Sequence, residues 1–219
     1  YASVNCFFNQ RERIRMFIPR NMEMKDHNLI CNFIKNNNFG VLTSSDLTAT
    51  HIPFVLKSDE GNKGTLYGHL AKANKHWKQF QNQRVLIVFN GPHAYISPTW
   101  YLYKPAVPTW NYAAVHCYGI VEIIDGEGVN EVMDDTILAH EPELLLNSDI
   151  MSTEYQAKLK NAIVAFKIVI DDYQGVEKLG QQRKIEDQHG VHLALKESKY
   201  SGANELAEYM EKRDLGIGS

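Results

Sequence analysis

The chain has 219 residues, of which 44% are hydrophobic and 22% are charged, and its formal net charge is −3. This size and composition predict one large globular domain, alone or with a small appendage. The slightly acidic balance excludes a general attraction for nucleic acid, because domains that bind phosphate backbones usually carry an excess of lysine and arginine.

The first fifteen residues are predicted to be an N-terminal arm. The segment 9–15 is polar and mixed in sign, and it lacks the apolar stretch of a signal peptide. No apolar run reaches the roughly 18 residues that a membrane span requires. The three cysteines are odd in number and match no metal-binding spacing, so we expect reduced, buried thiols in a cytoplasmic protein. They are Cys6, Cys31 and Cys117.

The first half of the chain is predicted to hold one helix and then a series of short strands. Asp26 can cap a helix that runs to about Asn36. Pro53 indicates an edge strand or a bulge, and Gly119 indicates a bend. A short helical turn is expected at 74–80. The expected strands are 41–45, 50–56, 64–70, 85–89, 94–100 and 115–124.

The second half is predicted to be mainly helical. Helices are expected at 129–139, 153–161, 185–197 and 204–213, and a further strand at 162–170. Short strands at close spacing favour an antiparallel barrel over a doubly wound parallel sheet.

Familiar catalytic and metal-binding patterns are absent. The nine histidines follow no ligand spacing with Cys, Asp or Glu. There is no Gly-x-Ser-x-Gly elbow, no P-loop and no Gly-x-Gly-x-x-Gly fingerprint. His93, His116 and Tyr112 are candidate acids or bases, but each is also explained as a structural residue.

A polar loop follows the strand at 64–70. His69, Lys72 and Asn74 lie there, and a helix that starts at about Asn74 would make the loop an anion site. A solvated turn with an asparagine cap is the alternative. A second polar set brackets the turn between the first two strands and would complete a phosphate pocket. Its members are Thr43, Ser44, Ser45, Thr50 and His51.

The stretch 91–119 is rich in aromatic residues and proline. Trp100, Trp110 and Tyr112 offer flat faces that would wall a planar ring system, and Asn111 would hydrogen-bond its edge. A dimer interface is the alternative, since tryptophan and tyrosine are enriched there. Lys104, the one Lys, Arg, Asp or Glu of the stretch, is expected to point to solvent.

Several blocks of this sequence resemble the PaiB family, FMN-binding split-barrel proteins described as negative transcriptional regulators. The blocks include "MFIPRNMEM" at 16–24, "GHLAKANKHW" at 68–77, "VLIVFNGPHAYISPTWY" at 85–101, "VPTWNYAAVHCYG" at 107–119 and "KLGQQRKIEDQHGV" at 178–191. The likeness runs from Met16 to about Leu195. It implies an α+β, mainly β fold: an antiparallel six-stranded split β-barrel over 16–184, with flanking helices and a C-terminal helical segment over 185–219.

The resemblance also implies a homodimer with FMN at the subunit interface. Phosphate contacts would come from Thr50, His51, Ile52, Pro53, His69, Leu70, Ala71, Lys72 and Asn74. Trp110 and Asn111 would face the flavin ring, and a Gln-Arg segment from the partner subunit would reach it with Gln181, Gln182 and Arg183. The expected family pattern there is Ser-Gln-Asn-Arg, whereas this chain has Gly180–Arg183 as Gly-Gln-Gln-Arg.

Three functions are therefore open: an FMN-binding regulator, a flavin-dependent oxidoreductase acting on a small substrate, and a split barrel that binds haem or no cofactor. The helix at 204–213 carries Glu205, Glu208 and Glu211, which is a poor pattern for a DNA recognition helix. Direct nucleic-acid binding is not expected, and regulation would act through a protein partner or indirectly.

Overall fold

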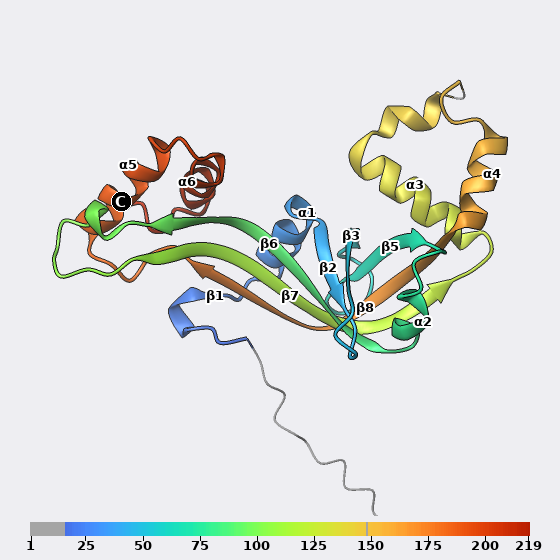
Figure 1. Ribbon diagram of the computed structural model, residues 1–219, viewed down its shortest axis with the longest axis horizontal. Helices are drawn as coiled ribbons and strands as arrows, with labels where there is room; N and C mark the ends of the chain where they lie inside the picture. Colours follow the sequence, from blue (N-terminus) through green and yellow to red (C-terminus); the bar gives the residue numbers. More distant parts are fainter. Residues whose placement is uncertain (1–15, 148) are drawn as a thin grey trace, which may run out of the picture.

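The computed structural model describes residues 16–147 and 149–219, and it is built around one curled antiparallel sheet (Figure 1). The predicted N-terminal arm at 1–15, including Cys6, lies outside the described residues. The strands are β1 (Glu23–Met24), β2 (Phe39–Thr43), β3 (Ala49–Pro53), β4 (Val55–Lys57), β5 (Thr65–Ala71), β6 (Arg84–Ile96), β7 (Thr109–Ile124) and β8 (Ile163–Lys178).

The sheet has eight strands in the order β3-β2-β6-β7-β8-β5-β4, with β1 added on β8. The two strands at the ends of this order, β3 and β4, are consecutive in the chain and are separated by Phe54 alone. One extended segment thus pairs with β2 before Phe54 and with β5 after it, which curls the sheet into a half-barrel. The predicted edge or bulge at Pro53 is confirmed, because β3 ends there at the edge of the sheet.

The predicted antiparallel, barrel-like sheet is confirmed, but the count of six strands is wrong. The expected strand at 50–56 is divided at Phe54, because the segment changes its pairing partner there. The expected strands at 85–89 and 94–100 are instead one strand, β6, which continues through a register shift between Asn90 and His93 and ends at Ile96. Long-range pairing extends β7 and β8 to 16 residues each, well beyond the segments that local propensity marks.

The helices follow the sequence pattern more closely. Asp26 accepts a hydrogen bond from the backbone N–H of Leu29 at 2.8 Å, so the predicted cap of α1 is confirmed. The predicted start of the last helix, at Asn204, is three residues late. The helices are α1 (His27–Asn36), α2 (Trp77–Phe80), α3 (Gly128–His140), α4 (Thr153–Ala162), α5 (Ile185–Lys196) and α6 (Ser201–Arg213), with short 3₁₀ turns at η1 (Arg20–Met22), η2 (Pro98–Trp100) and η3 (Pro142–Leu146).

Figure 1 shows that β6, β7 and β8 form a long arm that leaves the half-barrel. We call its residues 92–112 and 175–183 the distal arm. Helices α5 and α6 cover one face of the distal arm, whereas α3 and α4 lie at the opposite end of the molecule, between β7 and β8 in the chain.

Two hydrophobic cores correspond to these two regions. In the half-barrel, the ring of Phe54 packs edge-on against Phe89 and Phe166, and Phe80 packs against Phe166. A second core joins the distal arm to α5 and α6. Its buried members are Ala94, Ile96, Tyr101, Leu179, Val191, Leu195, Ala203, Leu206, Ala207 and Met210. Burial of this apolar surface is what holds the C-terminal helices on the arm.

A bulge in β8 marks the point where the arm leaves the half-barrel. The register with β7 shifts between Tyr118 and Gly119, as the predicted bend at Gly119 requires. A side chain at Gly119 would collide with the carbonyl oxygen of Val169, so only glycine fits this close approach.

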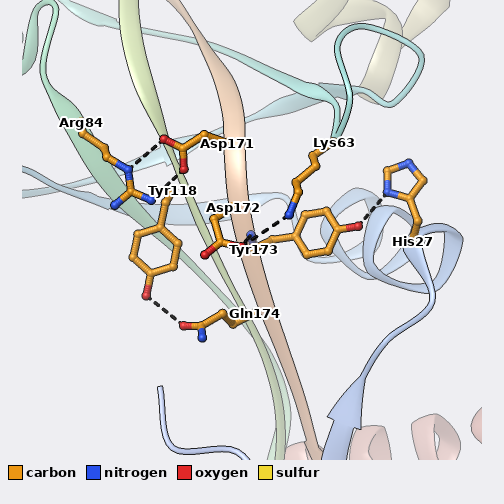
Figure 2. Close-up of polar contacts among 8 residues, drawn as sticks. All are labelled: His27, Lys63, Arg84, Tyr118, Asp171, Asp172, Tyr173 and Gln174. Atoms are coloured by element: carbon orange, nitrogen blue, oxygen red, sulfur yellow. Dashed lines mark hydrogen bonds and ion pairs between the residues drawn. The ribbon is translucent and has the colours of Figure 1, made fainter. Parts of the chain in front are cut away.

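Polar side chains gather around the bulge (Figure 2). Arg84 of β6 makes a two-pronged ion pair with Asp171 at 2.7 and 2.8 Å, reaching across β7. Lys63 pairs with Asp172 at 3.5 Å, and His27 of α1 hydrogen-bonds the Tyr173 hydroxyl at 3.2 Å. These contacts tie β6, α1 and the β4–β5 turn to a single stretch of β8.

Within residues 16–147 and 149–219, no helix is long and apolar enough to cross a membrane. Cys31 and Cys117 are free thiols, and the prediction that they are buried is confirmed.

Candidate functional site

A chain of hydrogen bonds joins the β2–β3 turn to the loop after β5. His76 is only 3% exposed, and its ring lies between two hydroxyl groups. Nε2 is 2.7 Å from the Ser44 hydroxyl, and Nδ1 is 2.8 Å from the Thr50 hydroxyl. Ser44 in turn donates to Asp46 Oδ1 at 2.5 Å, and the Asn74 side chain donates to Thr50 at 3.4 Å. We call these five residues the His76 relay.

The relay has one consistent direction. The Asp46 carboxylate can only accept hydrogen bonds, so the Ser44 hydroxyl donates its single proton to Asp46. The Ser44 oxygen must then accept from His76 Nε2–H. In the neutral imidazole Nδ1 is then an acceptor, so Thr50 donates to it and receives a proton from the Asn74 amide. Burial lowers the pKa of His76, and the nearby Asp46 carboxylate opposes this shift. The neutral form of the ring is therefore favoured near pH 7.

The loop after β5 presents cationic side chains next to the relay. The backbone N–H of Lys72 donates to the Ala162 carbonyl at 2.8 Å, and the Trp77 indole donates to the Lys72 carbonyl at 3.3 Å. These contacts fix the backbone of Lys72 while its side chain stays exposed. Lys75 is exposed as well, and within the described residues neither lysine is paired with a carboxylate. Two unneutralised ammonium groups beside a fixed loop suit an anionic group.

The expectation of a helix N-terminus at Asn74 is wrong. The α2 helix begins at Trp77 and is 4 residues long, which is too short for a useful dipole. The Asn74 side chain instead accepts from the backbone N–H of His76 at 3.1 Å and closes a turn. Any anion at this loop is thus held by side chains, and not by a helix terminus.

The phosphate-binding residues that the family resemblance predicts on β3 and β5 lie on two different faces of the sheet. Ile52 and Leu70 are buried in the core. Gly68 is on the same face of β5 as Leu70, and a side chain there would contact Ile52, Phe54 and Phe166. The alternation of a strand therefore turns His69 and Ala71 to the opposite face from Leu70, and likewise His51 and Pro53 from Ile52. Burial lowers the pKa of His69. Among the described residues, its buried Nδ1 atom finds no hydrogen-bond partner.

The other predicted site residues lie on the distal arm. Trp110 is 53% exposed on β7, while its neighbour Asn111 is buried. Gln182 is exposed, and the Arg183 guanidinium lies 4.6 Å from the centre of the Tyr101 ring. Gly180 has φ +79°, a left-handed conformation that favours glycine and explains the departure from serine at this position.

The Gln181 side chain is engaged in hydrogen bonds within the fold and is not directed to a ligand. Its side chain accepts from the backbone N–H of Leu179 at 2.8 Å and donates to the Glu177 carbonyl at 2.7 Å. It also donates to the Asn21 carbonyl at 3.0 Å. Of the Gln-Arg segment, Gln182 and Arg183 are the residues with side chains left for a ligand.

The relay and the distal arm lie too far apart to meet in one chain. His69 pairs with Ala165 at one end of β8, and Tyr112 pairs with Lys178 at the other. At roughly 3.3 Å per residue, the length of β8 between them spans about 40 Å. Thr50, Lys72 and Asn74 form one group, and Trp110, Asn111, Gln182 and Arg183 form another.

The sequence pattern marks His76 only as one of nine histidines without a ligand spacing, and it does not single out Asp46. The signal for the relay was weak, because its members lie on three separate segments that only the fold joins. Lys104 was also misjudged. Its ammonium donates to the carbonyl oxygens of Pro98 and Tyr101, so it closes the aromatic loop instead of pointing to solvent.

Comparisons with known proteins give a consistent picture. A family model described as "Putative FMN-binding domain" matches residues 16–172. The chain is 32% identical over 206 residues to "Protease synthase and sporulation protein PAI 2" of Bacillus subtilis, covering 90% of this chain and 98% of that protein.

Solved structures with a similar fold are more distant in sequence. The flavocytochrome Anf3 from Azotobacter vinelandii superposes with a TM-score of 0.56 at 15% identity, covering 74% of this chain and 73% of that one. The FAD and heme binding protein from Mycobacterium smegmatis superposes with a TM-score of 0.55 at 11% identity, covering 73% and 74%. At these identities the likeness concerns the fold alone.

Proposed function

Because this chain belongs to the family described as "Putative FMN-binding domain" and is similar to PAI 2 of Bacillus subtilis over nearly the whole length of that protein, we propose that it is an FMN-binding split-barrel protein that acts as a homodimer. The observation that carries the proposal is the loop with Lys72 and Asn74, fixed beside the His76 relay and within the segment that the family model matches.

The residues at this loop fit a phosphate monoester. Lys72 and Lys75 supply positive charge, and the Asn74 amide has a second N–H beyond the one that it gives to Thr50. The sequence carries no dinucleotide fingerprint that would hold a second phosphate and an adenosine, which favours FMN over FAD. FMN, when bound, supplies one- and two-electron redox chemistry.

A homodimer would bring the two groups of site residues together. Since they are separated by about 40 Å in one chain, the distal arm of a second copy is the natural source of the ring-facing residues. Trp110 and Tyr112 line a shallow hollow of about 320 Å³ together with Asn90 and His93, and this hollow would receive the flavin ring. Gln182 and Arg183 of the second copy would complete the site.

The physiological role is proposed to be regulatory, in line with the PaiB resemblance and with the relative's name, which refers to protease synthase and sporulation. The surface of α6 does not favour contact with DNA phosphates. Glu205 and Glu208 are exposed, and Arg213 is engaged by Glu177 at 2.7 Å. Regulation would therefore act through a protein partner or through the redox state of the flavin.

Identification of the cofactor tests the proposal. The protein is purified, its absorption spectrum is recorded, and the cofactor released on denaturation is identified by chromatography. Flavin absorption with FMN as the released species is expected. FAD as the main species, a Soret band, or a colourless protein that takes up no added FMN would each overturn the assignment. Turnover of NADH or NADPH by the loaded protein would favour the oxidoreductase alternative.

A further inference from the structure

A second, deeper cavity lies on the other side of Trp110. Its volume is about 540 Å³, and it is formed where strand β6 meets the start of α6. Strand β2 pairs with β6 only over residues 86–88, so within the described residues no strand covers the edge of β6 at 93–96. The cavity is formed within a single chain.

The two walls of this cavity come from different parts of the sequence. One wall is made by the aromatic stretch, with Tyr95, Trp100 and Trp110. The other is made by the α5–α6 loop and the first turn of α6, with Tyr200 and Gly202. The second wall lies beyond residue 172, where the match to the family model ends.

The lining has a definite chemical character. Four aromatic side chains face the cavity, and none of its lining residues is Asp, Glu, Lys or Arg. Tyr95 meets Trp110 edge to face, with 6.3 Å between ring centres and an interplanar angle of 76°, which leaves ring faces open for stacking. Trp110 is 53% exposed and Tyr200 is 81% exposed, so a ligand would remove a large apolar surface from water.

His93 adds one polar contact to this apolar setting. Its Nδ1 atom lies 3.0 Å from the Gly91 carbonyl oxygen, which can only accept. Nδ1 therefore carries the proton, and the neutral ring keeps Nε2 as an acceptor for a ligand hydroxyl. A charged ligand would lose its hydration without gaining a counter-ion in this lining.

We propose that this cavity binds an uncharged, planar aromatic molecule that bears a hydroxyl group. The cavity has walls of its own, with Trp100, Tyr200 and Gly202, although Trp110 and His93 line both the 540 Å³ cavity and the shallow hollow of about 320 Å³ assigned to the flavin ring. The inference goes beyond the proposed function and does not require that FMN bind.

The test uses a pair of probes that share a fused two-ring carbon skeleton and one hydroxyl group and that differ in the aromaticity and planarity of the rings. 2-Naphthol is titrated into the full chain by calorimetry, and decahydro-2-naphthol, its saturated and non-planar counterpart, is titrated in parallel. We expect 2-naphthol to bind at least about tenfold more tightly, because only the planar ring can stack. Equal affinity for the two probes, or no binding of 2-naphthol, would overturn the proposal.

Two variants locate the bound probe. Tyr200→Ala and Trp110→Leu are each expected to weaken 2-naphthol by roughly tenfold. Tyr155→Ala is the matched control, because Tyr155 is an exposed tyrosine on α4 at the other end of the molecule and should leave the affinity unchanged. If all three variants bind like the wild type, the probe is elsewhere and the proposal fails.

Competition and sedimentation separate the other possible occupants. Saturating FMN is expected to leave 2-naphthol binding intact, and displacement by FMN would assign the cavity to the flavin site instead. If Tyr200→Ala turns a dimer into a monomer while the wild type binds no 2-naphthol, a second copy of the chain occupies the cavity. Because FMN uptake is measured separately, failure here does not depend on the outcome of the cofactor test.

Discussion

Thr50 Oγ1 lies 2.8 Å from His76 Nδ1, although the two residues are 26 positions apart in the sequence. This bond joins strand β3 to the loop after β5 and is one end of the His76 relay. The loop that carries Lys72 is therefore held by a buried histidine whose neutral form is favoured by burial.

Removing the His76 ring nitrogens should destabilise the fold. His76→Phe keeps a ring in the core but deprives the Ser44 and Thr50 hydroxyls of their partner, which costs about 1–3 kcal/mol. His189→Phe is the control, because His189 is exposed on α5. Urea unfolding should show a lower midpoint for the first variant only. Equal midpoints for His76→Phe and the wild type would mean that the relay contributes nothing to stability.

The neutral His76 also predicts a pH dependence. Burial lowers the pKa of His76 in the folded protein below the value of about 6.5 in the unfolded chain, so the unfolded state binds more protons as the medium is acidified. Its stabilising contribution is full above about pH 6.5 and is lost as the pH falls towards the folded pKa.

Burial lowers the pKa of His69, His116 and His192 too, so the wild type as a whole should lose stability in the same direction. His76→Phe isolates one contribution. Its free energy of unfolding, measured from about pH 8 to about pH 5, should fall less steeply than that of the wild type. If the free energies of unfolding of the variant and the wild type change in parallel with pH, His76 has the same pKa in the folded and unfolded states.

Lys72→Ala should weaken FMN binding more than Lys158→Ala does. A charge-assisted hydrogen bond from Lys72 to the phosphate contributes on the order of 1.5–3 kcal/mol, which corresponds to a tenfold to hundredfold loss of affinity. Lys158 makes only an exposed ion pair with Glu154 on α4 and is a neutral control. Flavin titrations at low and high salt give both affinities. Equal losses of affinity in the two variants would show that the phosphate does not bind at this loop.

The protein should be a homodimer at low micromolar concentration. Besides the cavity-lining Tyr95 and Trp110, three exposed apolar side chains lie in the distal arm, and their burial between two copies would suit a specific interface of roughly 1,200–2,000 Å². They are Leu102, Tyr103 and Val107. Sedimentation velocity should show one species of twice the chain mass. A monomer under these conditions would leave each flavin site without its second half.

Arg213→Ala should destabilise the contact between α6 and β8. The Glu177 carboxylate is 4% exposed and is held by Arg213 at 2.7 Å and by the Tyr209 hydroxyl at 2.7 Å. Removal of the guanidinium leaves a buried charge without its counter-ion, which costs about 3–5 kcal/mol. Thermal unfolding should record a clear decrease in Tm.

The double variant Arg213→Ala with Glu177→Gln is the matched control for this effect. Glutamine is uncharged, so most of the lost stability should return if the buried charge is its cause. No recovery in the double variant would point to lost packing of the arginine side chain instead.

The sequence alone determined the features that depend on neighbours along the chain. Asp26 caps α1 because a short acidic side chain reaches the N–H of Leu29 three residues later. Pro53 ends β3, since proline cannot donate to a sheet, and Gly119 of β7 lies opposite the β8 bulge, where a side chain has no room. Each of these follows from the covalent geometry of a few consecutive residues.

Only the tertiary structure decided which distant residues meet. The merging of two predicted strands into β6, the division at Phe54 and the partners of His76 depend on register between strands far apart in sequence, and local propensity does not specify that register. The same long strands carry Lys72 and Arg183 to opposite ends of the molecule. A sequence motif records which residues a site uses, but the distance between them is set by the packing of the whole sheet.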